Sequence, residues 1–214
     1  MGLEMSRKEE VDIEKETKNR TLKFWEQENY DTMVHKDFYP NSGTLNDTSI
    51  LRAFESDLID VLFPDNVKHE NFEILDIGSG NGWHIKNIME KYPFLKITAT
   101  DYFIPETHYR PILKYLSHEA VKKFEGKFNA LMFISPPPML YVDYYAIKEY
   151  ELQKSDQKKI IIYIGELGAS DGGKGMYKYM LENSYWKLVH RKEIYVGKDI
   201  FGGESMKEIF VFTN

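Results

Sequence analysis

The sequence predicts a single-domain α/β fold with a mostly parallel seven-stranded sheet, helices on both faces and an antiparallel hairpin at its C-terminal end. From residue 72 onward, short apolar runs typical of buried strands alternate with segments whose apolar residues recur at helical spacing. The last two apolar runs have no helical segment between them, which favours a hairpin over a parallel crossover.

The expected strands are recognised by β-branched and aromatic residues bounded by turn signals. They cover residues 72–77, 95–101, 110–115, 128–135, 158–166, 186–196 and 207–213, with a loop at 197–206 joining the last two. The strand at 110–115 has the weakest signal. The strand at 128–135 ends where three prolines, which donate no ladder hydrogen bonds, follow from residue 136.

The expected helices fill the intervals between these strands. A first helix, with a cap among residues 46–48 and apolar positions Leu51, Phe54, Leu58 and Leu62, ends before Pro64. The second has Ile85, Ile88, Met89 and Tyr92 on its inner face and ends at Pro93. Further helices are expected at residues 117–124, where Ser117 is the predicted cap, at 139–154 and at 172–183.

The segment before the sheet differs in composition from the rest. Residues 1–20 interleave both charge signs with few large apolar residues, so we expect a charged flexible tail. Residues 21–64 are read as an aromatic arm or lid followed by the first helix, and residues 65–214 as the α/β domain. The start, MGLEMS, also fits the pattern for myristoylation of Gly2, which stays open beside an ordinary start.

Charge and composition limit the partners. The net charge of −6 gives no global positive field for nucleic acid, so nucleic acid is possible but not favoured. The sequence has no cysteine, which excludes disulfides and thiolate zinc sites and fits a cytoplasmic protein. No apolar run approaches the roughly 20 residues of a transmembrane helix. The six histidines show no metal-ligand spacing, so no metal is expected.

The strongest motif is FEILDIGSGNGWH, in which Gly78, Gly80 and Gly82 directly follow a buried strand that contains Asp76. Glycines permit positive φ and leave the backbone open to close contact by a ligand. A dinucleotide fingerprint would need a small residue where Trp83 stands, and a P-loop would need a following Gly-Lys-Ser/Thr. Both phosphate sites are therefore weaker interpretations than a ligand without phosphate.

The segment from Asp76 to Gly82 resembles motif I of class I S-adenosylmethionine-dependent methyltransferases, and the order of strands and helices extends this resemblance over residues 72–214. The resemblance implies a Rossmann-like methyltransferase fold and S-adenosyl-L-methionine as cofactor. It implies that Gly78, Ser79, Gly80 and Gly82 hold the methionine part of the ligand. Asp101 matches the acid that binds both ribose hydroxyls, because a carboxylate can accept two hydrogen bonds from a vicinal diol.

Other cofactor contacts follow from the same resemblance. Tyr102 or Phe103 would cover the adenine, and Ser117 and His118 occupy the place of the polar residue after the third strand. For Asp76 two interpretations stay open: a ligand contact, or a brace that holds the turn by accepting backbone hydrogen bonds. The same applies to Asp101 taken by itself, which is also typical of a turn that ends a strand.

The acceptor side is marked by ISPPP at residues 134–138. Ser135, Pro136 and Pro137 resemble the motif of amino-methyltransferases, which accepts hydrogen bonds from the target amine, although Pro138 stands where that motif has an aromatic residue. Three tyrosines that follow are either substitutes for this aromatic residue or simple packing residues of a helix: Tyr141, Tyr144 and Tyr145. The alternative is a rigid strand terminator without catalytic duty. Glu166, after the fifth strand, is a candidate to bind a substrate cation or take a proton, and equally a solvated loop residue.

Three functions therefore remain in view. The first is a methyltransferase whose acceptor is unknown, with a small molecule or protein slightly favoured by the acidic charge. The second is a nucleic-acid amino-methyltransferase that uses the Ser-Pro-Pro motif. The third is a non-catalytic cofactor-binding or scaffold protein with the same fold. This alternative stays open because methyl transfer requires alignment and no fixed catalytic triad, so the sequence carries no triad by which activity would be recognised.

Overall fold

The structure is a computed structural model that describes residues 58–63, 72–102, 104, 108–136, 142–154, 158–165, 176–198 and 204–214. The predicted tail of residues 1–20 lies outside this part of the chain, as does the predicted arm except for residues 58–63. Glu166 also lies outside it. The division of the chain into tail, arm and domain therefore stays a prediction.

Seven strands in the described residues form one sheet with the order β3-β2-β1-β4-β5-β7-β6. The strands are β1 Glu73–Ile77, β2 Lys96–Asp101, β3 Leu113–Lys114, β4 Ala130–Ile134, β5 Ile160–Gly165, β6 Lys187–Lys198 and β7 Glu204–Thr213. Strands β1 to β5 pair in parallel, whereas β7 pairs antiparallel to both β5 and β6. The predicted α/β class, the mostly parallel sheet and the antiparallel C-terminal hairpin are confirmed.

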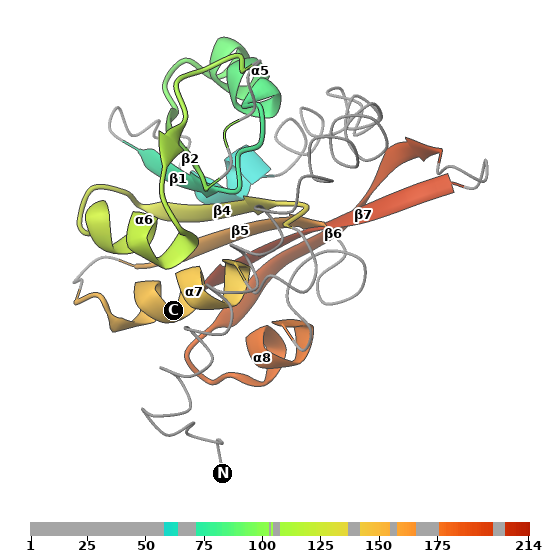
Figure 1. Cartoon of the computed structure of the whole chain (residues 1–214). Coiled ribbons are helices and arrows are strands. Elements are labelled where there is room, and N and C mark those ends of the chain that lie inside the picture. Colours follow the sequence, from blue (N-terminus) through green and yellow to red (C-terminus); the bar gives the residue numbers. More distant parts are fainter. Residues whose placement is uncertain are drawn as a thin grey trace, which may run out of the picture.

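Helices cover both faces of the sheet (Figure 1). On one face lie α4 (Ile59–Leu62) and α5 (Trp83–Lys91). Leu58 and Leu62 at α4 and Ile88 of α5 belong to a core on this face that also contains Ile74, Met132 and Val211. On the other face lie α6 (Ser117–Lys123), α7 (Val142–Leu152) and α8 (Met176–Glu182), which pack on a core that contains Leu131, Phe133 and Phe210. Strand residues buried on both faces explain why the strands read as continuous apolar runs.

The strand order reverses between β1 and β4. From β1 the chain proceeds outward to β2 and β3, then returns to place β4 on the other side of β1. Ile77 near the end of β1 lies beside Thr100 of β2 and Phe133 of β4, so the three carboxyl ends meet at one edge. Such a switch point is where open α/β sheets leave a crevice for a ligand.

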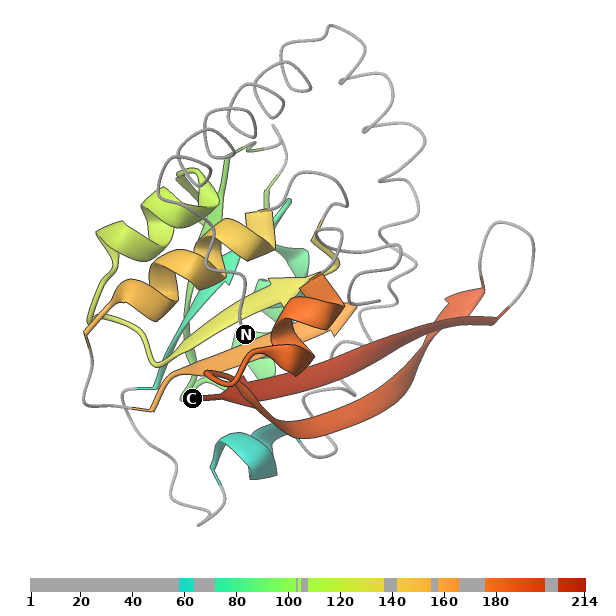
Figure 2. The same ribbon diagram turned by 90° about the horizontal axis from the view of Figure 1, so that it is seen from below.

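Two local predictions were wrong. Ser117 does not cap α6: it is the first helical residue, and Leu116 is the N-cap, with its N–H donated to the Glu119 carboxylate at 3.3 Å. The expected loop at 197–206 is partly strand, because β6 continues to Lys198 and β7 begins at Glu204. Strand β5 ends at Gly165 opposite Glu208, so this hairpin extends past the rest of the sheet (Figures 1 and 2).

Lys159 ties the C-terminal end of α7 to the start of β5. Its side chain is 3% exposed, and its ammonium donates to the carbonyl oxygens of Tyr150, Glu151 and Gln153 at 2.6, 3.0 and 2.6 Å. The carbonyls of Tyr150 and Glu151 belong to the last turn of α7, where backbone donors are few, and Gln153 directly follows this helix. The Tyr150 carbonyl also accepts Gln153 N–H at 3.3 Å. A buried lysine is stable here because its ammonium donates to several acceptors.

A second polar cluster joins α7 to α8 and β6 around the carboxylate of Glu151. Its Oε1 accepts hydrogen bonds from the Tyr179 hydroxyl at 2.5 Å and from Trp186 Nε1 at 2.7 Å, and Lys148 Nζ lies 3.2 Å from Oε2. Burial, followed by the interaction with Glu151, raises the pKa of the Tyr179 phenol well above its usual value.

In the described residues, no helix is long and apolar enough to cross a membrane.

Candidate functional site

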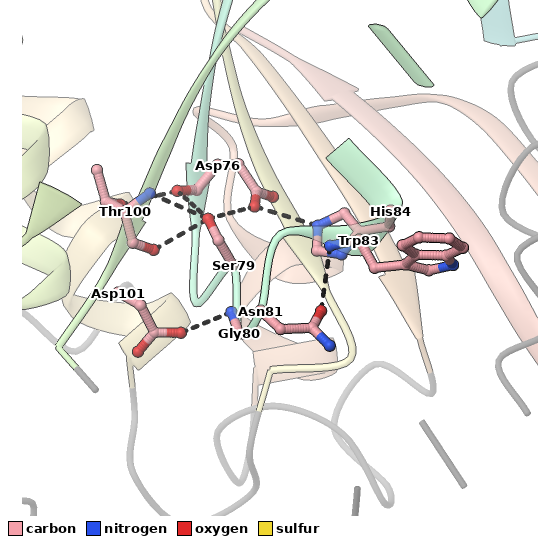
Figure 3. A network of polar contacts seen from close by, with 8 residues as sticks. All are labelled: Asp76, Ser79, Gly80, Asn81, Trp83, His84, Thr100 and Asp101. Carbon is pink, nitrogen blue, oxygen red and sulfur yellow. Dashed lines mark hydrogen bonds and ion pairs between the residues drawn. The ribbon is translucent and has the colours of Figure 1, made fainter. Parts of the chain in front are cut away.

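The glycine turn after β1 has the conformation that its sequence predicts. Gly78, Gly80 and Gly82 have φ values of 77°, 56° and 72°, a region that residues with a Cβ rarely adopt. Gly82 is the N-cap of α5, so the turn leads directly into this helix. Gly78 and Gly80 are half-buried along the edge where β1 ends, whereas Gly82 is buried against Ile112 and Arg110. Figure 3 shows the turn between β1 and α5.

Backbone and side-chain hydrogen bonds fasten the turn to β2. The N–H groups of Gly78 and Ser79 both donate to the carbonyl of Thr100, at 2.9 and 3.0 Å. In return, Thr100 N–H donates to Ser79 Oγ at 3.0 Å, and Thr100 Oγ1 donates to the Asp76 carbonyl at 2.7 Å. Ser79 is 2% exposed, so this cross-link lies inside the protein.

Asp76 lies beneath the turn and is 1% exposed. Its Oδ2 accepts a hydrogen bond from Ser79 Oγ at 2.6 Å and lies 3.2 Å from His84 Nε2 (Figure 3). Its Oδ1 is buried and has no hydrogen-bond partner. The carboxylate therefore holds the turn through the side chains of Ser79 and His84, and not through the backbone N–H groups considered from sequence. Its Oδ1 is left for a further hydrogen-bond donor.

Asp101 ends β2 and reaches the glycine turn. Its Oδ2 accepts a hydrogen bond from Gly80 N–H at 2.8 Å, so the two motifs that sequence reasoning linked lie in contact (Figure 3). The neighbouring Tyr102 is half-buried, and Lys114 Nζ from β3 lies 5.3 Å from the centre of its ring. A carboxylate and an aromatic ring thus lie next to each other at the start of the segment that follows β2.

The start of α6 meets the start of α7. The rings of His118 and Tyr145 are 6.4 Å apart, whereas Tyr144 packs on Tyr179 of α8 with ring centres 5.4 Å apart. Two segments singled out separately from sequence, the residues after the third strand and the tyrosines after the proline motif, are therefore neighbours. Of the two tyrosines, Tyr145 is on the side of α6 and Tyr144 belongs to the packing with α8.

Ser135 ends β4 in an unusual backbone conformation. It is the non-glycine residue with positive φ, 44°, in the described part of the chain, and its N–H donates to the Ile164 carbonyl of β5 at 2.7 Å. Its Oγ is buried without a hydrogen-bond partner, and the following Pro136 is buried as well. Strain of this kind, together with an unpaired hydroxyl, is more common at functional sites than in ordinary loops.

A further aromatic group beside the turn was not foreseen from sequence. Trp83, the first residue of α5, packs edge-on against Tyr109 with ring centres 4.4 Å apart, and Lys86 Nζ lies 5.0 Å from the Trp83 ring centre. Tyr109 N–H donates to the carbonyl of Asn81 at 2.9 Å, so the segment around residue 109 lies against the turn. His84 was also missed as a partner of Asp76, because the contact depends on the direction in which α5 leaves the turn.

Several predicted residues lie outside the described part of the chain: Phe103, Pro137, Pro138, Tyr141 and Glu166. Their roles stay predictions. Among the described side chains, no group of three or more histidines and carboxylates is arranged to hold a metal ion.

The fold and the site define a class: a Rossmann-like α/β protein with the architecture of class I methyltransferases. No family sequence model matches the chain, and no curated protein sequence matches it. Similarity is found among solved structures. The plantazolicin methyltransferase BamL, solved with a triazolic desmethylPZN analog and SAH, is 12% identical, with a TM-score of 0.51 over 96% of this chain and 99% of that chain.

Two other solved structures are similar at lower scores. A SAM-dependent methyltransferase from Anabaena variabilis is 11% identical, with a TM-score of 0.49 over 78% of this chain and 86% of that chain. A SAM-dependent methyltransferase from Methanosarcina mazei is 11% identical, with a TM-score of 0.47 over 68% of this chain and 93% of that chain. At 12% identity, the similarity to the plantazolicin methyltransferase establishes a shared fold, which is the one that the sequence predicts.

Proposed function

We propose that this chain is an S-adenosylmethionine-dependent methyltransferase. The observation that carries the proposal is the contact between the glycine turn and Asp101, which joins exposed backbone and a carboxylate at the switch point of the sheet. The plantazolicin methyltransferase of similar fold and length was solved with SAH, which supports a ligand of the same kind here.

The described residues fit this cofactor. A Cβ built on Gly78 would meet no atom within 4 Å, so the backbone there is open to a ligand. The unpaired Oδ1 of Asp76 needs a hydrogen-bond donor, and the methionine part of the cofactor carries an ammonium group. Asp101 would accept hydrogen bonds from the ribose hydroxyls, and Tyr102, Ser117 and His118 would border the adenine.

When bound, S-adenosylmethionine would supply a methyl group activated by a sulfonium. The demands on the protein are alignment of the acceptor for in-line attack and exclusion of water. The turn and Asp101 would hold the cofactor in one orientation. Ser135 and Pro136, at the end of the neighbouring strand β4, would border the acceptor, with Glu166 as the proposed group for a substrate cation or proton.

Calorimetric titration with S-adenosylmethionine and S-adenosylhomocysteine tests the cofactor. Asp101→Ala removes an acceptor of hydrogen bonds that are worth about 1.5–3 kcal/mol each when one partner is charged, so affinity should fall by roughly 10- to 100-fold. Asp60→Ala, an exposed residue of α4, serves as the matched control and should bind like the wild type. Absence of binding to the wild-type protein at millimolar ligand refutes the proposal.

The acceptor class is proposed from charge. The net charge of −6 favours a small molecule or protein over nucleic acid. Transfer of a labelled methyl group to separate pools of metabolites, protein and nucleic acid identifies the class. Binding of cofactor without transfer to any pool would support the alternative of a non-catalytic cofactor-binding protein.

The cytoplasmic location expected from the sequence stays a prediction.

A second candidate, transfer to an amino group, is favoured by Ser135. Its buried hydroxyl lacks a partner and its backbone is held at positive φ, which suits a polar group aimed at a target amine. Ser135→Ala should then lower kcat at least about tenfold, the typical contribution of one hydrogen bond to the transition state, while cofactor affinity stays unchanged. An unchanged kcat would leave Ser135 as a strand terminator. If the amine belongs to nucleic acid, binding must weaken steeply with salt.

A further inference from the structure

The carboxylate of Asp76 has two oxygens in different situations. Oδ2 lies 3.2 Å from His84 Nε2 and accepts the Ser79 hydroxyl, whereas Oδ1 is buried without a partner. The side chains of His84 and Asp76 are 14% and 1% exposed, so water screens their interaction weakly. The charge state of His84 therefore acts strongly on the carboxylate.

The surroundings of this pair contain charges of both signs. Asp101 lies at the turn through Gly80, Lys86 of α5 holds its ammonium 5.0 Å from the Trp83 ring centre, and Arg110 packs beside Gly82. His84 is the second residue of α5, and the N-terminal end of a helix disfavours a cation. Among the described side chains, the favourable partner of a protonated His84 is therefore Asp76.

We infer that the Asp76 carboxylate pairs with one cation at a time, so that binding of the cofactor and protonation of His84 oppose each other. This inference rests on the proposed function, because the competing cation is the α-ammonium of the bound ligand. With His84 neutral, the carboxylate offers its full charge to the ammonium. With His84 protonated, the pair is already neutral, and the imidazolium repels a second cation nearby.

The linkage has a definite sign. The bound state holds fewer protons than the free state, so binding releases a proton and affinity falls as the pH falls. Because imidazole side chains in general change charge between about pH 5 and 8, binding is measured over this range. One linked proton changes the affinity by up to about tenfold per pH unit.

Calorimetry with S-adenosylhomocysteine tests the inference without catalysis. At each pH from 5.5 to 8, the binding heat is measured in two buffers of different ionisation heat, and their difference gives the number of protons released. Wild-type protein should release protons on binding within this range. The same titration with 5′-methylthioadenosine, which lacks the amino-acid part, should release none.

His84→Gln provides the matched variant, since glutamine keeps a hydrogen bond to Asp76 and cannot titrate. Its affinity for S-adenosylhomocysteine should change by less than about twofold over the same pH range, against several-fold for the wild type. Equal proton release by wild type and variant overturns the inference, as does equal release with the two ligands. Binding without any release overturns it and leaves the proposed function intact, whereas no binding of S-adenosylhomocysteine overturns both.

Discussion

Ser79→Ala should destabilise the protein more than its small change in volume suggests. The substitution removes a 2.6 Å hydrogen bond to the buried Asp76 carboxylate, worth about 1.5–3 kcal/mol because one partner is charged. It also removes the 3.0 Å acceptor of Thr100 N–H, and an unpaired buried N–H costs about 1–3 kcal/mol. Since neighbouring contributions do not add fully, we expect a loss of about 3 kcal/mol in the free energy of unfolding.

Thermal unfolding followed by circular dichroism measures this loss. For chains of 150–250 residues, 1 kcal/mol corresponds to about 2–4 °C, so Tm should fall by about 6–12 °C. The control is Ser184→Ala, an exposed serine in the turn before β6, whose Tm should stay within about 2 °C of the wild type. If both variants unfold at the same temperature, the cross-link between the turn and β2 carries no net energy and the reasoning fails.

Two further predictions concern the face that carries α7. Lys159→Met should lower the free energy of unfolding in urea by about 3 kcal/mol, because the carbonyls of Tyr150, Glu151 and Gln153 lose their hydrogen bonds from the ammonium. Exposed Lys158→Met should change this free energy by less than about 0.5 kcal/mol, and similar losses in both variants would contradict the capping role. The raised pKa of Tyr179 contributes stability that is complete below about pH 10 and is lost as the pH rises further. The free energy of unfolding of Tyr179→Phe should therefore fall less steeply above pH 10 than that of the wild type. Equal slopes of this free energy against pH in alkaline urea titrations would contradict the prediction.

The sequence predicted those parts of the fold that depend on local pattern. Residues such as Ile74 and Leu131 lie in short apolar runs because their strands are buried on both faces, and such runs can be recognised without knowing their neighbours. The glycine turn and Asp101 were linked through the resemblance to motif I. The structure brings them into contact through Gly80 N–H, while the binding roles assigned to them stay predictions.

Other features depend on contacts that local pattern does not encode. The pairing of His84 with Asp76 follows from the angle at which α5 leaves the turn, and Lys159 finds its partners only when β5 docks beside the end of α7. The misplaced cap at Ser117 has a local cause. Glu119 accepts the N–H of Leu116, so the helix starts one residue earlier than the serine suggested.

The bonds from Gly78 and Ser79 to Thr100, and from Gly80 to Asp101, join groups of the protein itself. Under the proposed function, they would hold the turn in one conformation for the adenosine part of the cofactor, so that less conformational entropy is lost on association. Under the proposed function, substitutions at the end of β4 would alter the choice of methyl acceptor without breaking the hydrogen bonds that hold the turn.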